Sequence, residues 1–247
     1  MNEPRSLAIP PALDVLSASE PVALFLDFDG TLVAIADTPD GIEVPSDLAA
    51  RLEALAARVG QRLALVSGRS PGNLAEHLGP VLVAIAGSHG MARTGRDGQP
   101  VGTPPRQIAD AALARIEAAA AAAGAAVERK AHGMALHYRL APEREADVLA
   151  AAHELAATHG LIVKQGKCVA ELVPPGGDKG SAVRAFMTEA PFAGTVPVFV
   201  GDDVTDEDGF RAATELGGFG IAVGERPSDS ARYHLSSVSD VHAWLNL

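Results

Sequence analysis

The chain has 247 residues and a formal net charge of −11, with 47% hydrophobic and 21% charged residues. These values are ordinary for a globular protein of one large or two small domains, and the acidic balance argues against binding to nucleic acid or to an anionic membrane, which needs basic surface. A single cysteine, Cys168, excludes an intrachain disulfide and a cysteine-rich zinc site.

The first residues of the given sequence do not predict a secretory leader. Prolines interrupt its apolar residues, so it lacks the continuous apolar core of a secretory leader. No run of the chain approaches the roughly 18 apolar residues that a membrane span needs. We therefore expect a soluble, cytoplasmic protein whose first ~20 residues are loosely ordered.

Five apolar runs predict the buried strands of a parallel sheet. They lie at residues 22–26, 63–66, 81–86, 196–200 and 220–223. Continuous apolar runs bounded by polar and glycine residues are typical of strands buried on both faces. Helical patterns alternate with them, as in 46–59, where Ser46 can cap the helix and Gly60 can end it. This alternation predicts a doubly wound α/β core of the Rossmann-like kind.

The middle of the chain predicts a second, smaller α/β domain. The expected order is helix, two strands, helix and two strands, at residues 107–123, 126–129, 134–140, 142–159, 161–165 and 168–173. Proline- and glycine-rich segments at 102–105 and 174–177 mark its boundaries. We thus expect a discontinuous core, 1–102 and 178–247, interrupted by a domain of residues 103–177 that opens and closes as a cap over a site.

Residues 27–31, Asp-Phe-Asp-Gly-Thr, follow the first predicted strand. Residues two apart in an extended segment project to one side, so Asp27 and Asp29 can both face a ligand at the sheet edge. One carboxylate can attack phosphorus to form an acyl phosphate, and the other can protonate the leaving alkoxide and later deprotonate water. Taken alone, the motif is also compatible with a simple Asp-Gly turn after a buried strand.

Two further motifs suit a phosphate, although each has a simpler interpretation. Ser67-Gly68-Arg69 ends the second predicted strand, where a hydroxyl and backbone amides can bind phosphoryl oxygens. By itself it is more readily explained as a helix cap by Ser67 or Ser70. Lys179 opens a predicted helix, where the helix dipole disfavours a cation. A bound phosphate would explain it, and a solvated surface lysine is the alternative.

Residues 202–208 concentrate five acids, Asp202, Asp203, Asp206, Glu207 and Asp208, behind the fourth predicted strand. Carboxylates this close repel one another unless a cation compensates, and hard oxygen ligands suit Mg²⁺. An acidic, solvated helix start would account for the last three acids. It does not account for Asp202, which directly follows an apolar strand.

In this order the motifs resemble those of the haloacid dehalogenase superfamily of phosphohydrolases. The matching residues are Asp27, Asp29, Ser67, Lys179, Asp202 and Asp203. Asp29 marks the phosphatase and phosphomutase branch of that superfamily. The stretches DFDGTLVAIADTPD, ERKAHGMALHYR, GKCVAELVPPGGDKG and PVFVGDDVTDEDGF are similar, more specifically, to those of trehalose-6-phosphate phosphatases.

The resemblance implies Mg²⁺-dependent hydrolysis of trehalose 6-phosphate to trehalose and phosphate, in trehalose biosynthesis, through an aspartyl-phosphate intermediate. It implies that Asp27 is the nucleophile and a metal ligand, and that Asp29 is the general acid/base and gives its carbonyl oxygen to the metal. Ser67 and Lys179 would hold the phosphoryl group as catalytic residues, and Asp202 would be a metal ligand.

Further residues are implied around this centre. Asp203 and Asp206 would lie in the second coordination shell of the metal, where Asp203 orients metal-bound waters or Lys179. Substrate contacts are expected from Glu128, Lys130, Glu171, Arg69, Ser88 and His89, of which the first three match the positions that hold sugar hydroxyls. Glu128 and Lys130 share a face of their predicted strand, so an exposed sheet face with cross-strand salt bridges is the alternative.

Other functions remain open at this point. The chain could act on another sugar phosphate, such as sucrose phosphate or mannosylglycerate phosphate, or, less readily, be a phosphomutase. A non-catalytic regulatory domain of the same fold is the alternative from a different class, but such copies lose acids that are intact here. We expect a monomer with a small sugar phosphate as its partner.

Overall fold

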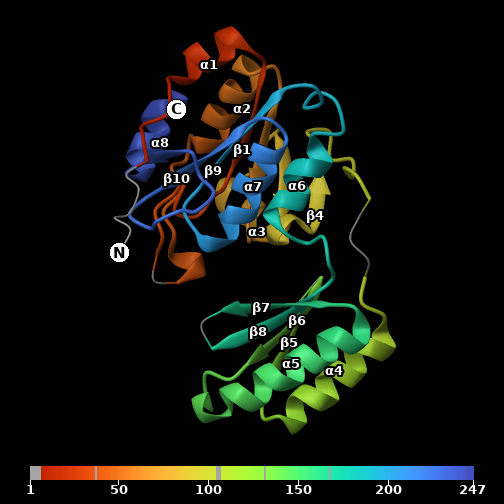
Figure 1. The fold of residues 1–247 in the computed structure, drawn as a ribbon. Helices are drawn as coiled ribbons and strands as arrows, with labels where there is room; N and C mark the ends of the chain where they lie inside the picture. The colour runs from red at the N-terminus through yellow and green to blue at the C-terminus, as the bar shows by residue number, and fades with distance from the viewer. Residues whose placement is uncertain (1–6, 37, 104–106, 131, 167) are drawn as a thin grey trace. The chain divides into compact units, whose positions relative to one another are not determined.

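The computed structural model describes residues 7–36, 38–103, 107–130, 132–166 and 168–247. The chain divides into two compact units. Unit 1 consists of Met1–Pro104 together with Asp178–Leu247, and unit 2 of Pro105–Gly177 (Figure 1). Within the described ranges, no helix has both the length and the apolar character to cross a membrane.

Unit 1 is built on a seven-stranded sheet, parallel except at one edge. Its strands, in spatial order, are β11 (Tyr233–Leu235), β10 (Phe219–Val223), β9 (Val196–Gly201), β1 (Val22–Leu26), β2 (Leu63–Val66), β3 (Ala84–Gly87) and β4 (Ala92–Thr94). Only β4 runs antiparallel to its neighbour. In the centre Leu26 lies opposite Val200 of β9 and Leu65 of β2, so these three strands end together.

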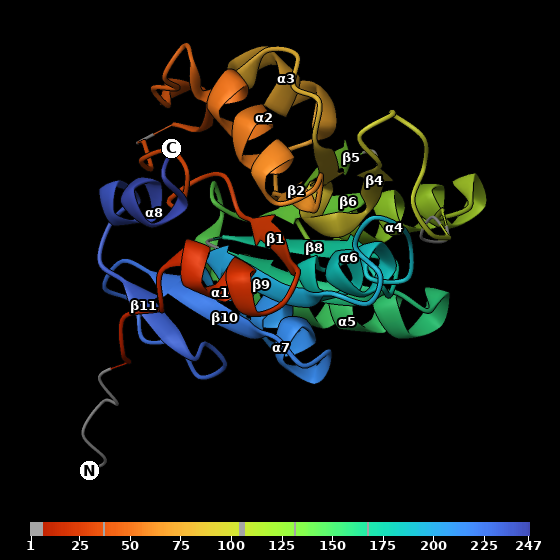
Figure 2. The ribbon, with the colours of Figure 1, turned by 90° about the horizontal axis from the view of Figure 1, so that it is seen from above.

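Helices cover both faces of this sheet, which explains the continuous apolar strands. One face packs against α1 (Leu13–Ser19), α2 (Leu48–Arg58), α3 (Pro71–Leu78) and α8 (Val238–Leu245), and the other against α6 (Lys179–Phe186) and α7 (Glu207–Glu215) (Figure 2). Along β1, Leu24 and Leu26 enter the first core and Ala23 and Phe25 the second, all fully buried. The predicted doubly wound α/β fold is confirmed.

Unit 2 is an antiparallel sheet backed by two helices. Its strands are ordered β5 (Ala126–Lys130), β6 (Gly133–His137), β8 (Val169–Val173) and β7 (Ile162–Gly166). The helices α4 (Asp110–Ala122) and α5 (Glu145–His159) pack on one face of the sheet around Ile116, Val148 and Leu136. Among the described residues of unit 2, no helix packs on the other face, called here the open face, which carries polar side chains.

The beginning of the chain is more ordered than predicted. Leu13 of α1 is 2% exposed, Ala8 bridges to Tyr233 at the edge of the sheet, and the indole nitrogen of Trp244 donates to the carbonyl of Pro11 at 2.8 Å. The prediction of a loosely ordered start is therefore wrong for residues 7–20, and residues 1–6 lie outside the described ranges. The reason is a long-range contact, the docking of α1 beside α8, which local composition does not reveal.

Several element boundaries also differ from the prediction. The strand expected at 81–86 begins at Ala84, because Leu82 is exposed and its amide donates to Glu53 instead of a neighbouring strand. Helix α2 is preceded by Asp47, not Ser46, and has no side-chain cap. Of the predicted boundary segment 102–105, residues 104 and 105 lie outside the described ranges. Short elements that were not predicted are α1, α3, α8, β4, β11 and the 3-10 turns η1 (Pro39–Gly41), η2 (Ser88–Gly90), η3 (Pro142–Arg144) and η4 (Val204–Asp206).

The docking of α1 predicts a measurable contribution to stability. Leu13→Ala removes a buried side chain from the first core, so the free energy of unfolding should fall by about 2–5 kcal/mol, as measured by urea denaturation. Val15→Ala in the same helix is the control, because Val15 is 61% exposed and its loss should stay within about 0.5 kcal/mol. Equal, small effects of both substitutions would contradict the docking.

Candidate active site

The candidate site lies where the central strands of unit 1 end. Asp27 follows β1, Ser67 follows β2 and Asp202 follows β9, and the carboxyl ends of parallel strands meet at one edge of a sheet. The amide of Asp27 still donates to the carbonyl of Val200 in the ladder at 2.9 Å. The predicted residues from three separate motifs are thus brought to one edge, with Asp27 and Ser67 both buried.

Lys179 connects two of the acids at this edge. Its ammonium lies 2.7 Å from Oδ1 of Asp27 and 2.6 Å from Oδ1 of Asp206, and the side chain is 3% exposed. Helix α6 starts at Lys179 because the Asp178 carboxylate accepts from the amide of Ser181 in a capping box. A solvated surface lysine, the alternative raised by the sequence, is therefore excluded.

The charges in this cluster do not balance. Burial and the neighbouring Asp206 raise the pKa of Asp27 well above its usual value, although the Lys179 ammonium opposes this. Burial, with Asp206, also raises the pKa of Asp202 to about 6. Burial would lower the pKa of Lys179, but the two carboxylates hold it above its usual value, so the lysine stays charged. Three acids share one cation, which leaves an excess of negative charge.

The three acids fit a divalent metal ion. Asp27, Asp202 and Asp206 offer carboxylate oxygens within 4.8 Å of one another, and Oδ1 of Asp202 is buried with no hydrogen-bond partner among the described residues. Gly30 makes room for this arrangement, since a Cβ at this position (φ +75°) would lie 2.1 Å from Oδ2 of Asp202. An unpaired, buried carboxylate oxygen beside two further acids is the donor set of a hard cation.

Asp29 faces a different partner from Asp27. Both of its carboxylate oxygens accept from Nε of Arg69, at 3.0 and 2.8 Å, and one also accepts from Nη2 at 2.7 Å. Nη1 of the same guanidinium donates to Asn73 at 2.7 Å. Arg69, predicted as a substrate contact, therefore holds the second aspartate of the first motif in this structure.

The loops after β2 and β3 are joined by backbone hydrogen bonds. The hydroxyl of Ser67 accepts from the amide of Arg69 at 3.1 Å, the amide of Ser88 donates to the carbonyl of Arg69 at 2.7 Å, and that of His89 donates to the carbonyl of Ser67 at 2.9 Å. Ser88 and His89 both have positive φ, 51° and 56°, a costly conformation for residues other than glycine. The predicted residues Ser67, Arg69, Ser88 and His89 are thus neighbours.

The acid-rich motif is organised differently from the prediction. Asp203 is exposed, and its backbone amide donates to Oδ2 of Asp206 at 2.9 Å. Lys179 is held by Asp27 and Asp206; the role predicted for Asp203, orienting metal-bound waters or Lys179, stays a prediction. Asp206 and Glu207 are buried, which also excludes the solvated helix start. The reason is the 3-10 turn η4, which points Asp206 back toward the strand end.

Three predicted sugar-binding residues share the open face of unit 2. The register places Glu128 opposite Ala135, and Ala135 opposite Glu171. Lys130 lies two residues after Glu128 in β5, so the three charged side chains project from one face. The ammonium of Lys130 donates to Glu171, and Nε2 of His137 lies 2.9 Å from Glu128. Glu128, Lys130 and Glu171 are therefore brought together as a half-exposed cluster of charges.

Sequence reasoning missed Arg226, which lies just after β10. Nε of Arg226 donates to the carbonyl of Asp202 at 3.1 Å. Arg226, Asp202 and Gly30 line a cavity of about 360 Å³ at the carboxyl edge of the sheet. The position of Arg226 behind the fifth apolar run was the one available signal, since that run predicts a strand ending at the same edge.

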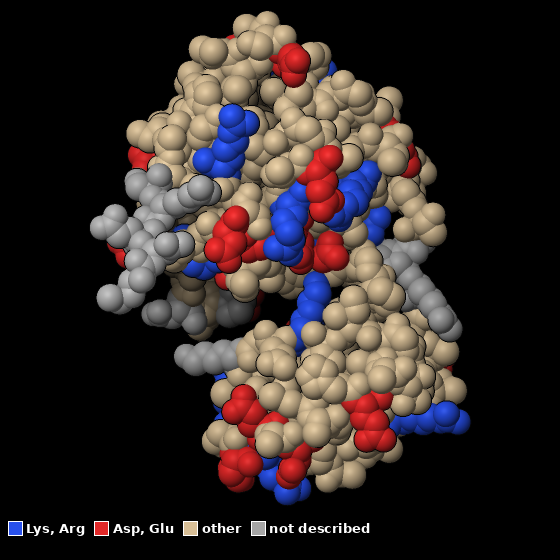
Figure 3. Space-filling model, viewed as in Figure 1, with Lys and Arg blue, Asp and Glu red and all other residues tan. Residues whose placement is uncertain are grey.

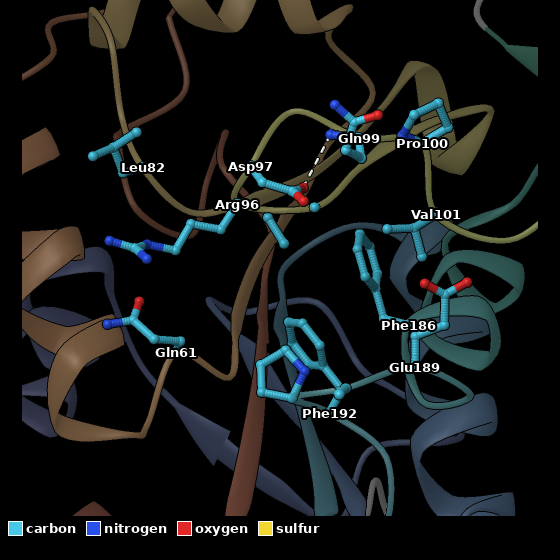
Figure 4. Close-up of a pocket in the computed structure, with 14 residues that line it drawn as sticks. Gln61, Leu82, Arg96, Asp97, Gln99, Pro100, Val101, Phe186, Glu189 and Phe192 are labelled. Atoms are coloured by element: carbon cyan, nitrogen blue, oxygen red, sulfur yellow. Dashed lines mark hydrogen bonds between the residues drawn. The ribbon is translucent and has the colours of Figure 1, made fainter.

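A second cavity opens at the other end of the sheet. Its volume is about 550 Å³, and it is lined by residues just before β2 and β3 and by the segment after α6, including Gln61, Leu82 and Phe192 (Figure 4). Its carboxylate Asp97 accepts from the amide of Gln99, as the dashed line shows. None of the residues at the carboxyl edge lines this cavity. We therefore do not assign it as the candidate active site, although it is the larger of the two cavities.

The surface around α6 and α7 is mixed in charge. In Figure 3 basic and acidic side chains alternate over these helices, and Arg184 of α6 pairs with Glu215 of α7 at 2.6 Å. This visible face of unit 1 therefore offers no continuous basic surface of the kind that nucleic acid requires.

A buried aspartate–lysine–aspartate cluster at the carboxyl edge of a parallel sheet, in a chain whose second α/β unit interrupts the first, defines a phosphohydrolase of the haloacid dehalogenase class. A solved phosphatase of that superfamily from Bacteroides thetaiotaomicron has the same fold, with a TM-score of 0.65 over 92% of this chain and 94% of the other, at 16% identity.

More specific comparisons agree. The family model described as trehalose-phosphatase matches residues 25–239. The chain is 38% identical to the trehalose-6-phosphate phosphatase of Escherichia coli (strain K12) over 96% of this chain and 90% of that protein. It is 40% identical to a probable trehalose-phosphate phosphatase of Sinorhizobium fredii over 90% and 84% of the two chains. A solved trehalose-6-phosphate phosphatase of Aspergillus fumigatus superposes with a TM-score of 0.73 at 25% identity, covering 98% of each chain.

The chain belongs to the trehalose-phosphatase family. The predicted family, fold class and enzyme class, a phosphoric monoester hydrolase, are confirmed by these matches. The three acids at the carboxyl edge agree with a metal site in such a phosphatase.

The charge excess predicts an unusual pH dependence of stability in metal-free protein. The folded-state pKa of Asp202, about 6, is higher than its ordinary value of 3.8, so the folded state binds this proton more tightly. The contribution of Asp202 to the free energy of unfolding should therefore fall as the pH rises from about 4 to 6. In EDTA, Asp202→Asn should be more stable than the parent at pH 7, and the difference should vanish near pH 4.

Thermal unfolding from pH 4 to 7 checks this expectation. Saturating Mg²⁺ serves as the control, because a bound cation stabilises the parent carboxylates and should reverse the order at pH 7. If the unfolding temperatures of the parent and of Asp202→Asn in EDTA changed with pH in the same way, the raised pKa of Asp202 would not be affecting stability, and this expectation would be wrong.

Proposed function

We propose that the chain hydrolyses trehalose 6-phosphate to trehalose and phosphate with Asp27 as the nucleophile. The observation that carries this proposal is the placement of Lys179 between the buried carboxylates of Asp27 and Asp206. A carboxylate approaching a phosphate dianion meets repulsion, and a fixed ammonium beside it offsets that repulsion in the transition state.

The reaction has two displacement steps. In the first, an oxygen of Asp27 bonds to phosphorus while the bond from phosphorus to the sugar oxygen breaks, and Asp29 gives its proton to that leaving oxygen. In the second, Asp29 takes a proton from water, whose oxygen attacks phosphorus and releases Asp27. The acid step requires Asp29 to be protonated and turned from Arg69 toward the leaving oxygen. Ser67, with the amides behind β2, holds the phosphoryl oxygens.

A magnesium ion would be held by Asp27, Asp202 and the carbonyl oxygen of Asp29. The buried, unpaired Oδ1 of half-buried Asp202 and the surplus of negative charge support this assignment. Asp206 has an oxygen near the same point, but its bonds to Lys179 and to the amide of Asp203 occupy both carboxylate oxygens, so its role is to hold the lysine. When bound, the cation would supply charge neutralisation at the phosphoryl oxygens.

The open face of unit 2 is proposed to recognise the sugar. Carboxylates and ammonium groups suit hydroxyls, which both donate and accept hydrogen bonds. Glu128, Lys130 and Glu171 gather on this face around Ala135. Cross-strand salt bridges alone would produce the same pairs, so substrate discrimination is the deciding measurement.

No described contact favours sucrose phosphate or mannosylglycerate phosphate, and a phosphomutase reaction finds no support in the family match. The acids that non-catalytic relatives lose are all present. A cytoplasmic location, a monomeric state and the absence of nucleic-acid and membrane partners stay predictions.

Phosphate release from trehalose 6-phosphate tests the function, with sucrose 6-phosphate and glucose 6-phosphate beside it. We expect Mg²⁺-dependent turnover that prefers trehalose 6-phosphate and is abolished by EDTA. Asp27→Asn should lose more than about a thousandfold in kcat, since no other group can form the acyl phosphate. Asp29→Asn should lose about 10²–10⁴-fold or stall as phosphoenzyme.

The matched control for Asp27→Asn is Asp208→Asn. It removes a carboxylate from the acid-rich motif whose ion pair, among the described residues, is with the exposed Arg211, and it should keep nearly full activity. Rapid turnover by Asp27→Asn would sink the proposed nucleophile, and preference for another sugar phosphate would reassign the substrate.

Glu171→Ala tests the role of the open face. It should spare kcat/KM for p-nitrophenyl phosphate, which has no sugar to recognise, and lower kcat/KM for trehalose 6-phosphate by about tenfold or more. Glu117→Ala is the control, because Glu117 forms its ion pair with Arg129 from α4, on the helix side of the same unit. Equal losses on both substrates would place Glu171 in folding or in the common chemistry instead.

A further inference from the structure

Arg226 clasps the backbone of the acid-rich motif. All three nitrogens of its guanidinium donate hydrogen bonds: Nε to the carbonyl of Asp202 at 3.1 Å, Nη2 to the carbonyl of Asp203 at 3.0 Å, and Nη1 to the carbonyl of Pro227 at 3.0 Å. Two consecutive carbonyls of the motif are thus bound by one rigid, planar group. A lysine has a single nitrogen and cannot span them in this way.

Glu207 holds the guanidinium in place. One of its oxygens accepts from Nη2 of Arg226 at 2.9 Å and the other from the amide of Ser230 at 3.0 Å. Burial raises the pKa of Glu207, but hydrogen bonds from Arg226, Ser228 and Ser230 outweigh it and hold the pKa below its usual value. The pair therefore stays ionised at neutral pH and ties the loop after β10 to the start of α7.

The hydrogen bonds of Arg226 to the two carbonyls and to Glu207 form a clasp. This clasp connects directly to the residues of the candidate catalytic centre. The peptide that joins Asp202 to Asp203 has its carbonyl on Arg226, while its amide donates to Oδ2 of Asp206 at 2.9 Å. Asp206 in turn holds Lys179, which holds Asp27. Rotation of this one peptide would turn the Asp202 side chain and break the bond that orients Asp206.

We propose that Arg226, held by Glu207, is a positioning residue that fixes the peptide between Asp202 and Asp203 so that the acids present a preformed divalent-metal site. The inference rests on the proposed function for the metal site itself. Without the clasp, the acids would repel one another and move apart. Part of the free energy of cation binding would then be used to bring them together again, so the affinity would fall.

Direct metal binding tests this inference without relying on turnover. Mn²⁺ is titrated into substrate-free protein and followed by electron paramagnetic resonance of the free ion. Arg226→Met should weaken Mn²⁺ binding by about 10–100-fold, the usual effect of losing an outer-shell partner, and Arg226→Lys should recover only part of that loss. The activation constant for Mg²⁺ in phosphate release should shift by the same factor, while kcat at saturating Mg²⁺ changes less.

Arg211→Met is the matched control. It removes an arginine of α7 that bonds to the Asp208 side chain but to no backbone carbonyl in the described structure, and Mn²⁺ affinity should stay within about twofold of the parent. Thermal unfolding of every variant without metal distinguishes a residue that orients the metal site from one that only stabilises the fold. A guanidinium that only braces the fold would lower the unfolding temperature and leave Mn²⁺ affinity unchanged, which overturns the inference.

If Arg226→Met fails to fold, a second variant tests the inference in its place. Glu207→Gln keeps one acceptor for Arg226 but cannot retain the charge that holds it, so it should also weaken Mn²⁺ binding, by several-fold or about 1 kcal/mol. Unchanged affinity in Glu207→Gln would then refute the clasp. If the parent itself binds no Mn²⁺, the proposed metal site fails, which is a different result from a parent that binds and a variant that binds equally well.

Discussion

The buried ammonium of Lys179 is the interaction on which the site depends. It joins Asp27 after β1, Asp206 in η4 and the start of α6, which come from distant parts of the chain. A buried ion pair is costly to form, but removing one partner leaves an uncompensated charge that is costlier still. Because α6 begins directly where the chain returns from unit 2, the same contact fixes both segments of unit 1 to one edge of the sheet.

One lysine does not neutralise three acids, and that imbalance has a functional meaning. Asp202 retains an unpaired buried oxygen, and its raised pKa records how unfavourable the third carboxylate is without a counter-ion. Sites tuned for binding and catalysis often hold charges in arrangements that do not favour stability. Gly30 helps to form this charged arrangement, because its lack of a side chain allows the Asp202 carboxylate to approach the loop after β1.

The two units carry different chemistry. Unit 1 offers a hydroxyl, an ammonium and carboxylates at the ends of strands, where charge on a phosphoryl group can be met. Unit 2 offers an ion pair, Lys130 with Glu171, and a hydrogen-bonded pair, His137 with Glu128, on the sheet face opposite its helices. Alternating polar and small residues on that face suit a neutral, hydroxyl-rich ligand, whereas the buried cluster suits an anion with a metal ion.

The sequence by itself determined the parallel sheet and the residues at its edge. Strands buried on both faces appear as continuous apolar runs, and period-two geometry places Asp27 and Asp29 at the end of the first. Which groups then pair was decided only by tertiary structure. Lys179 binds Asp27 and Asp206, Asp29 turns to Arg69, Arg226 clasps the acid-rich motif, and α1 docks beside α8. Local spacing fixes the direction in which a side chain leaves its own strand or turn, but the distance between side chains from separate segments depends on strand register and on the paths of the intervening loops.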